Sequence, residues 1–418
     1  MNDTCNCTPT TTGLKSYEEA LELLLQHAVP VQEQETVPLG DALGRILAEP
    51  VRSTIDVPGW DNSAMDGYAV RVADVPEEGT RLKVSQHIPA GTAPEPLEPD
   101  TAARIFTGAP IPEGADAVVM QEQTSPRGDE VQIDTLPEPG ANIRRAGEDI
   151  EAGSVIVEAG TRLQPQHLGL AASVGVGELT VKRPLKVAVL ASGDELLMPG
   201  EPLKPGMIYN SNIFTVSGLL QAMGCEVIDM GQVADTLEAT KEALAEAAER
   251  ADLVIASGGV SVGEEDHVRP AVQALGSLDL WKIAIRPGKP LAFGHIGDTP
   301  FIGTPGNPVS LFVTFLLFAR PFILKSLGLN EYRNRAIRTT AAFDWPRPDK
   351  RREFHRARLE RGADGENIVE IYPSRSSAVL SSVTWANGLV ILPENHVIRG
   401  GEPVEFMPFC ELIGWGSA

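Results

Sequence analysis

The sequence predicts a multidomain α/β plus β protein built around a central, doubly wound, mostly parallel α/β domain. Apolar runs typical of buried parallel strands alternate with helical segments between Pro184 and Leu327. Short strand-like segments separated by Pro and Gly fill residues 80–146 and the chain beyond Leu329, which indicates β-rich modules on both sides of that domain. The length of 418 residues is also too great for a single hydrophobic core.

Changes in sequence character along the chain give the expected domain boundaries. Residues 1–15 are polar and rich in Thr, so we expect a flexible tail there. The other expected units are an N-terminal mixed α/β linker domain at 16–56 plus 147–182, a β-rich module at 57–146, the α/β domain at 183–328 and a C-terminal β-barrel-like domain at 329–418.

The composition excludes several classes of function. A formal net charge of −22 argues against general binding to nucleic acid or to an anionic membrane, so an anionic ligand must meet locally concentrated Lys and Arg. Four scattered cysteines form no disulfide framework, which fits a reducing cytoplasm. Residues 1–15 lack the apolar segment of a signal peptide, and the apolar run 311–319 is too short to span a bilayer. We therefore expect a soluble cytoplasmic protein.

Apolar spacing and capping residues predict the elements outside the α/β domain. Ser16 and Glu19 form a capping box that begins an amphipathic helix over 17–28. Further helices are expected at 40–48 and 165–174. Strands are expected at 81–87, 102–107, 117–123, 130–134 and 178–182, and beyond Leu329, where the helices stop, at 336–343, 352–360, 368–371, 389–392 and 403–408.

The α/β domain itself is expected to alternate strands and helices. The strands are predicted at 185–191, 226–230, 253–257, 283–285, 291–293 and 301–303. The helices are predicted at 212–223, 237–250, 267–275 and 308–327. Ligands of such sheets bind outside the carboxyl ends of the strands, so the residues that follow each strand are the binding candidates.

A glycine-rich loop at 257–266 follows the third strand and ends on acidic residues. Its candidates for binding an anion are Ser257, Gly258, Gly259, Ser261 and Gly263. Backbone N–H groups can converge on an anion here because the glycines carry no side chain to keep it away. Three acids close the loop, and the last of them is Asp266. Amides beside carboxylates predict a phosphorylated ligand bound with a divalent cation, whereas a simple tight turn is the alternative interpretation.

Polar or charged residues follow the other strands of this domain. Glu195 comes after the first strand and Asp235 after the second, where Asp235 can instead serve only as a helix N-cap. The remaining candidates are Lys282, Arg286, Lys289, Pro305, Gly306, Asn307 and Pro308. Asn307 is expected to cap the last helix, with Pro308 at its first position and free N–H groups aimed outward. Carboxylates, cations and helix-start amides on one face suit a metal ion or an oxyanion together with a phosphorylated organic ligand.

Binding candidates also occur outside the α/β domain. The loop at 57–70 is dense in polar side chains and turn formers and contains Asp66. Thr107 ends a strand of the β-rich module, and Asp149 lies in the charged loop that leaves it. The C-terminal domain adds Arg356, within a cluster of arginines, and Ser377, in a polar turn. Taken singly, a turn or a solvated strand face explains each of these residues about as well as ligand contact does.

Seven ordered motifs carry a resemblance to a known family. They are DNSAMDGY at 61–68, TGAP at 107–110, RAGED at 145–149, SGDE at 192–195, SGGVSVG at 257–263, PGKP at 287–290 and PGNP at 305–308. With these motifs the sequence resembles the molybdopterin molybdenumtransferase family (MoeA), which includes the E domain of gephyrin. The resemblance runs from about Ser16 into the C-terminal β domain.

The resemblance implies a fold and a reaction. The implied fold is a four-domain, elongated homodimer in which 16–56 plus 147–182 form the dimerisation domain and 183–328 the molybdopterin-binding domain. The implied reaction is Mg²⁺-dependent insertion of molybdate into adenylylated molybdopterin, with release of AMP. A molybdopterin adenylyltransferase and apo-molybdoenzymes, or their chaperones, would be transient partners.

The resemblance also implies roles for the candidate residues. Asp66, Thr107 and Asp149 match site positions of the second domain, Pro305 and Pro308 match the loop beside the ligand, and Arg356 and Ser377 match positions in the C-terminal domain. Glu195, Asp235 and Asp266 are assigned to positioning Mg²⁺, and Lys282, Arg286 and Lys289 to holding oxyanion and phosphate charge. Arg286 stands where some family members have Lys, and its guanidinium prefers planar, bidentate contacts.

Two alternative functions share part of this pattern. A molybdopterin adenylyltransferase also carries the Ser-Gly-Gly-x-Ser and Pro-Gly-Asn-Pro motifs, but that activity normally belongs to a free-standing α/β domain. A gephyrin-like scaffold is the second alternative, and it would not require acids at the ends of strands.

Overall fold

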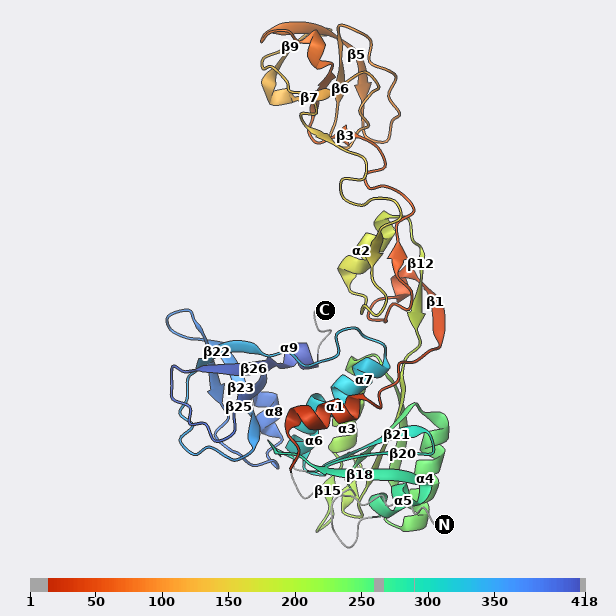
Figure 1. Ribbon diagram of the computed structural model, residues 1–418, viewed down its shortest axis with the longest axis vertical. Helices are drawn as coiled ribbons and strands as arrows, with labels where there is room; N and C mark the ends of the chain where they lie inside the picture. Colours follow the sequence, from red (N-terminus) through yellow and green to blue (C-terminus); the bar gives the residue numbers. More distant parts are fainter. Residues whose placement is uncertain (1–13, 259–266, 289, 414–418) are drawn as a thin grey trace, which may run out of the picture.

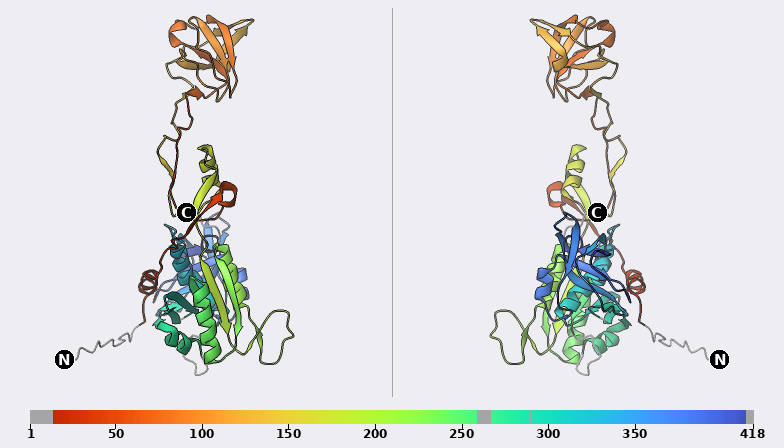
Figure 2. Two further views of the ribbon diagram at one scale, coloured as in Figure 1. Left: turned by 90° about the vertical axis from the view of Figure 1, so that its right-hand side faces the viewer. Right: turned by 90° about the vertical axis from the view of Figure 1, so that its left-hand side faces the viewer.

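The computed structural model describes residues 14–258, 267–288 and 290–413. The molecule is elongated, with a six-stranded β module at one end and an α/β sheet beside a β-barrel at the other (Figure 1). Narrow two-stranded ribbons connect the two ends (Figure 2). The predicted fold class is therefore confirmed, whereas the domain boundaries stay a prediction.

The α/β sheet has the strand order β16-β13-β17-β21-β20-β18. Its strands are β13 (Lys186–Ser192), β16 (Glu226–Val233), β17 (Leu253–Ser257), β18 (Gly276–Lys282), β20 (Pro290–Ile296) and β21 (Thr299–Thr304). The first four strands in that order are parallel, and β20 and β18 are antiparallel additions at the edge. The strand order reverses between β13 and β17, so a crevice is expected where these strands end.

Helices cover both faces of this sheet. They are α3 (Asn212–Ala222), α4 (Leu237–Arg250), α5 (Val268–Leu275) and a continuous helix made of α6 (Pro308–Thr314), the π-helical η4 (Phe315–Ala319) and α7 (Arg320–Ser326). Val187 and Val189 of β13 pack with α3 and the 308–326 helix, whereas Ala188 and Leu190 pack with α4 and α5. This alternation in a wholly buried strand is what a sheet covered on both faces requires.

The 308–326 helix belongs to the largest core. Of the helices that the structure describes, it alone is long and apolar enough to cross a membrane, but 94% of it is buried inside the protein. Leu21 and Leu24 of α1 (Tyr17–Leu25) pack into the same cluster, although α1 was assigned to the linker domain. The predicted capping box is confirmed, because Glu19 N donates to Ser16 Oγ at 3.1 Å and Ser16 N donates to Glu19 Oε2 at 2.8 Å.

The C-terminal strands close into a barrel. They are β22 (Ile337–Ala341), β23 (Arg352–Arg361), β24 (Asn367–Ile371), β25 (Gly388–Leu392) and β26 (Pro403–Pro408). The ring closes because β23 pairs with both β24 and β25. The barrel also carries the short helices α8 (Ser381–Trp385) and α9 (Phe409–Leu412), so the prediction that helices stop at Leu329 is wrong.

A strand of the α/β region joins the barrel. The predicted strand at 283–285 is wrong as placed, because β18 ends at Lys282 and β19 (Ile285–Arg286) pairs in parallel with β23 instead. Ile283 makes an isolated bridge with Lys15, in the segment expected to be a flexible tail. The pairing of β19 with β23 thus attaches the barrel beside the α/β sheet.

The distal β module has the strand order β7-β4-β6-β5-β9-β8. Its strands are β4 (Gly67–Val70), β5 (Thr80–Ile88), β6 (Thr101–Ile105), β7 (Ala117–Met120), β8 (Thr124–Arg127) and β9 (Glu130–Ile133), with 3-10 turns η2 (Val72–Asp74) and η3 (Gln121–Gln123). The pair β3 (Asn62–Ser63) and β10 (Ile143–Arg144) lies at its base. Strands form at the four positions predicted here, but the one predicted at 117–123 ends at Met120 and 121–123 form η3. β8 was not predicted.

The connecting ribbons pair segments far apart in the sequence. They are β1 (Gln34–Pro38) with β12 (Glu178–Lys182), and β2 (Val51–Arg52) with β11 (Val155–Val157), beside α2 (Pro165–Ser173). The predicted helix at 40–48 is wrong, because only the 3-10 turn η1 (Leu39–Asp41) forms. Gly44 adopts φ +78°, and the backbone at Ile46 and Leu47 bridges to distant strands, so tertiary pairing replaces the helix.

Candidate functional site

A cavity of about 1020 Å³ lies where the α/β sheet faces the barrel. The strand ends Ser192 of β13 and Ser257 of β17 line it, at the point where the strand order reverses. The predicted site residues that line it are Glu195, Ser257, Gly258, Arg286, Pro305, Gly306, Asn307, Pro308, Arg356 and Ser377. The expected ligand face of the α/β sheet therefore exists, and the barrel supplies its opposite wall.

Glycine backbone forms part of the sheet-side wall. Gly258 has φ +83°, and a Cβ there would lie 3.2 Å from Ser192 O, so only glycine fits without strain. Gly288 has φ +84°, and a Cβ there would lie 2.7 Å from Thr314 Oγ1. Glycine at both positions therefore lets these loops pack closely against neighbouring segments of the wall.

The start of the 308–326 helix differs from the prediction in detail. Pro308 occupies the first helical position as predicted, but the side chain of Asn307 makes no capping hydrogen bond. Val309 N donates instead to Ser377 O at 3.1 Å, which ties the helix to the barrel. The N–H group of Val309, one of the helix-start groups predicted to face a ligand, therefore already has a hydrogen-bond partner within the protein.

The predicted metal ligands are only partly gathered. Glu195 lines the cavity, whereas Asp235 is absent from the described lining and accepts a hydrogen bond from Ser192 Oγ at 3.3 Å. Asp266 lies outside the described residues. Within the ranges that the structure describes, no group of three or more His, Cys, Asp or Glu side chains could hold a metal ion.

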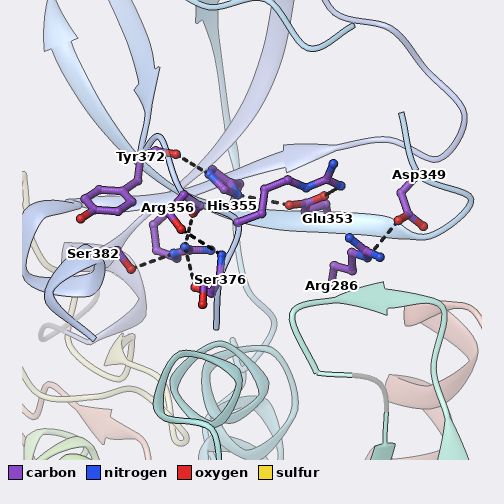
Figure 3. Close-up of polar contacts among 10 residues, drawn as sticks. Arg286, Asp349, Glu353, His355, Arg356, Tyr372, Ser376 and Ser382 are labelled. Carbon is purple, nitrogen blue, oxygen red and sulfur yellow. Dashed lines mark hydrogen bonds and ion pairs between the residues drawn. The ribbon is translucent and has the colours of Figure 1, made fainter. Parts of the chain in front are cut away.

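Arg356 is the most deeply buried cation of the barrel wall, with 1% of its surface exposed. Its Nε donates to Ser382 Oγ at 2.9 Å, and Nη2 donates to Ser374 O at 2.6 Å and to Ser376 O at 3.2 Å (Figure 3). Burial lowers the pKa of Arg356. Arg356 thus holds the loop that carries Ser377, in addition to lining the cavity.

Glu353 is a buried carboxylate in the same wall. Its Oε2 accepts from Arg375 Nη2 at 2.6 Å, and its Oε1 lies 3.2 Å from His355 Nδ1 (Figure 3). Burial by itself raises the pKa of Glu353, but the hydrogen bonds from His355 and Arg375 outweigh it and hold that pKa below its ordinary value. Glu353 is therefore a carboxylate that is already neutralised by its neighbours.

Arg286 enters the cavity from β19 beside Asp349. Its Nε lies 2.9 Å from Asp349 Oδ2 in an ion pair, but the angle is outside hydrogen-bond geometry (Figure 3). Asp349 Oδ1 also accepts from Arg351 N at 3.0 Å. Burial raises the pKa of Asp349, but the hydrogen bonds from Arg351 and the charge of Arg286 lower it by more, so the pKa lies below the ordinary value.

Several predicted residues lie away from the cavity. Asp66 and Thr107 belong to the β module at the far end of the molecule, and Asp149 lies at its base, where Asp149 N donates to Val57 O at 3.0 Å (Figure 1). Lys282 is exposed at the end of β18 and is absent from the described lining. Lys289 and three members of the glycine loop lie outside the described residues: Gly259, Ser261 and Gly263.

Asp66 and Thr107 nevertheless form a defined pair. Asp66 Oδ1 accepts from Thr107 N at 2.8 Å and from Thr107 Oγ1 at 2.9 Å. The backbone hydrogen bond, followed by that of the hydroxyl, lowers the pKa of Asp66. Asp66 and Thr107, which only the family resemblance had assigned to the same site, are therefore in direct contact.

Some cavity residues were given no role from the sequence. They are Tyr209, Asn210, Asn212, Arg351, Glu353 and Arg375. The polar run at 209–212, directly before a predicted helix, was a usable signal for the first three. Arg351 and Arg375 lie in segments noted as an arginine cluster and a polar turn. Nothing in the sequence distinguishes Glu353 from the many exposed acids.

Family models and relatives match nearly the whole chain. Models described as "MoeA N-terminal region (domain I and II)", "Probable molybdopterin binding domain" and "MoeA C-terminal region (domain IV)" match residues 15–175, 188–325 and 338–409. The molybdopterin molybdenumtransferase of Haemophilus influenzae is 40% identical over 94% of this chain and 98% of its own length. Molybdopterin molybdenumtransferase 2 of Mycobacterium tuberculosis is 40% identical over 87% of this chain and 91% of its own.

Solved structures agree with the sequence matches. Two crystal structures of the molybdopterin biosynthesis MoeA protein from Pyrococcus horikoshii cover 95% of this chain, with TM-scores of 0.79 and 0.83 at 34% and 31% identity. This chain covers 99% and 100% of those chains. On the strength of three family models in order and relatives at 40% identity, the chain belongs to the MoeA family.

Proposed function

We propose that this chain is a molybdopterin molybdenumtransferase of molybdenum cofactor biosynthesis, which inserts molybdate into adenylylated molybdopterin and releases AMP. The curated relatives with this name match the chain over nearly its full length, which supports a transferase. No relative named here is an adenylyltransferase or a scaffold, so neither alternative is favoured.

The observation that carries the proposal is the charge of the cavity. Four arginines and two carboxylates are among its described lining residues, and Asp349 pairs with two of these arginines, Arg286 and Arg351, which still leaves an excess of positive charge in a protein whose net charge is −22. Molybdate and a pyrophosphate bridge are both multiply charged anions, and arginine suits such oxyanions. A volume of about 1020 Å³ is also large enough for a nucleotide-sized ligand.

The two walls suit two parts of the reaction. The glycine backbone at Gly258 and Gly306 allows phosphate groups to lie against the ends of the strands. Arg286 and the barrel arginines provide charge that stabilises the phosphate of departing AMP as its bond to the pterin phosphate breaks. Binding of both anionic groups in one cavity places them close enough to react.

Mg²⁺ fits the residues present, although the described part of the chain holds no three-ligand cluster. Mg²⁺ commonly takes one or two protein carboxylates and completes its shell with water and substrate phosphates. Glu195, whose carboxylate lies in the cavity wall, would supply such a ligand. When bound, the ion would neutralise charge on the pyrophosphate.

A homodimer is part of the proposal. Asp66 and Thr107 lie at the opposite end of the molecule from the cavity (Figure 1). One chain therefore cannot bring the Asp66–Thr107 pair and its own cavity to the same ligand. Exposed apolar side chains occur at both regions: Met65 and Phe106 adjoin Asp66 and Thr107 in the sequence, and Ile208 and Tyr209 line the cavity. Docking of one region on the other in a second copy would bury both sets.

The remaining partners follow from the same proposal. A molybdopterin adenylyltransferase would supply the adenylylated pterin, and apo-molybdoenzymes or their chaperones would receive the product. We propose a cytoplasmic location with no nucleic-acid or membrane partner, in keeping with the net charge of −22 and the buried apolar helix.

The test is release of AMP from purified adenylylated molybdopterin by the purified chain. We expect release only when both molybdate and Mg²⁺ are present, and Glu195→Gln should raise the Mg²⁺ concentration needed for half-maximal rate. Equal release without molybdate would overturn the insertion reaction. Formation of the adenylylated pterin from ATP by this chain alone would instead establish an adenylyltransferase.

A further inference from the structure

The arginines of the barrel wall differ in how far their N–H groups are already used. Arg356 is 1% exposed, and its Nε and Nη2 donate to Ser382, Ser374 and Ser376. Arg375 follows Ser374 in the same loop, its side chain is 37% exposed, and its hydrogen bond within the described chain is the one from Nη2 to Glu353. Arg375 therefore retains donors that a ligand in the cavity can reach, whereas those of Arg356 mostly serve the fold.

The guanidinium of Arg375 is held in place from two sides. Glu353 Oε2 lies 2.6 Å from Nη2, and the ring centroid of Trp345 lies 4.6 Å from Cζ. Both partners are buried, with exposed fractions of 4% for Glu353 and 9% for Trp345. A stacked and paired guanidinium loses little freedom when an anion binds, so less of the binding free energy is spent on ordering it.

The charge of Arg375 is only partly neutralised by Glu353. His355 Nε2 lies 2.8 Å from Tyr372 O, and a carbonyl can only accept, so Nε2 carries a hydrogen. The other ring nitrogen, His355 Nδ1, lies 3.2 Å from Glu353 Oε1. The carboxylate of Glu353 is thus shared between His355 and Arg375.

We infer that Arg375 is a further anion-binding residue of the cavity, positioned by Glu353 and Trp345, and that it binds a tetrahedral oxyanion. The oxyanion is either molybdate or the phosphate of the nucleotide. This inference deepens the proposed function and rests on it. Arg375 lies outside the seven motifs that carry the family resemblance.

The chain offers a matched control in Arg358. Its Cζ lies 4.6 Å from the ring centroid of Trp385, the same distance as for Arg375 over Trp345, and it lies on β23. Arg358 is absent from the described lining of the cavity. Removing either guanidinium changes the net charge equally and uncovers a tryptophan, but only Arg375 faces the ligand.

Steady-state AMP release by Arg375→Gln, Arg375→Lys and Arg358→Gln tests the inference. We expect Arg375→Gln to raise the KM for molybdate or for the adenylylated pterin about ten- to hundredfold, with kcat changed less than about twofold, because a hydrogen bond to a charged group is lost. Lysine keeps the charge but not the planar fork, so Arg375→Lys should give a smaller rise. Arg358→Gln should behave as wild type.

Binding of molybdate alone and of AMP alone, measured by calorimetry without turnover, identifies the oxyanion. Weaker binding of molybdate by Arg375→Gln supports contact with the inserted metal oxyanion, and weaker binding of AMP supports contact with the nucleotide phosphate. Unchanged binding of both, with KM values equal to those of Arg358→Gln, would overturn the inference. Failure of wild-type AMP release to depend on molybdate would instead overturn the proposed function, and the binding measurements would still report on Arg375.

Discussion

Asn212 Nδ2 donates to Ser257 Oγ at 3.0 Å, which joins the first residue of α3 to the last residue of β17. The same nitrogen donates to Gly306 O at 2.8 Å. One side chain therefore connects three segments that meet at the cavity, and none of them is a neighbour of another in the sequence. The amide is in a position to fix the shape of the sheet-side wall.

Asn212→Ala is expected to loosen this wall. Two intramolecular hydrogen bonds are lost at a partly exposed site, at about 1 kcal/mol each, so the free energy of unfolding should fall by up to about 2 kcal/mol and the KM for adenylylated molybdopterin should rise. Asn330→Ala is the control, because Asn330 Nδ2 donates to Ala159 O at 2.7 Å away from the cavity. An unchanged KM in Asn212→Ala would show that the loops hold their shape without it.

The pKa of Asp66 should depend on the hydroxyl of Thr107. The backbone and hydroxyl donors of Thr107 lower that pKa, so Thr107→Val should bring it back toward the ordinary value of 3.8, while Thr107→Ser should not. A carboxyl whose folded pKa is lowered stabilises the fold above its unfolded pKa and loses that contribution as pH falls through the folded pKa. NMR titration of the Asp66 carboxyl carbon measures the shift, and identical curves for all three proteins would contradict the assignment.

Mixing two inactive variants tests the shared site. If the proposed dimer completes the site, Asp66→Ala and Glu195→Ala should each lack AMP release, because each removes one half of the proposed two-chain site. After subunit exchange, half of the dimers are mixed and carry one intact site of two, so roughly a quarter of wild-type activity should return. Two samples of Glu195→Ala mixed in the same way serve as control. Lack of recovery after proven exchange would place the whole site in one chain.

Glu353 should matter for stability as well as for the cavity. Glu353→Ala leaves Arg375 and His355 without their carboxylate and should lower the free energy of unfolding by about 3–5 kcal/mol, and Glu353→Gln by less. Because the folded pKa of Glu353 is below the ordinary 4.5, its contribution is present above pH 4.5 and is lost as pH falls through the folded pKa. The difference between wild type and Glu353→Gln should therefore shrink in acid.

Urea unfolding at several pH values measures the effect of Glu353. Glu331→Gln is the matched control, because Glu331 pairs with Arg335 where both side chains are more than half exposed. A surface pair of this kind contributes at most about 1 kcal/mol. Equal effects of Glu353→Gln and Glu331→Gln would show that the buried network does not stabilise the barrel.

Local patterns in the sequence were sufficient to predict most of the α/β region. The strand Leu253–Ser257 and the helix Leu237–Arg250 were predicted with the observed bounds, because a short buried run and a capped amphipathic helix are determined by neighbours in the chain. The helix predicted at 40–48 failed for the opposite reason. Its backbone pairs with segments more than a hundred residues away, which no local pattern reports.

The candidate site divides in the same way. The motifs at the ends of strands identified the glycine, proline and carboxylate residues of the sheet-side wall, since parallel strands bring their carboxyl ends to one edge. The sequence by itself thus determined the fold class, the α/β sheet and half of the cavity. The tertiary structure decided the barrel side: β19 leaves the α/β region to pair with β23, and this pairing brings Glu353 and Arg375, which had no predicted role, to the cavity beside the predicted Arg356. A contact between strands about 65 residues apart depends on how two domains pack, and that packing is not encoded in any short segment.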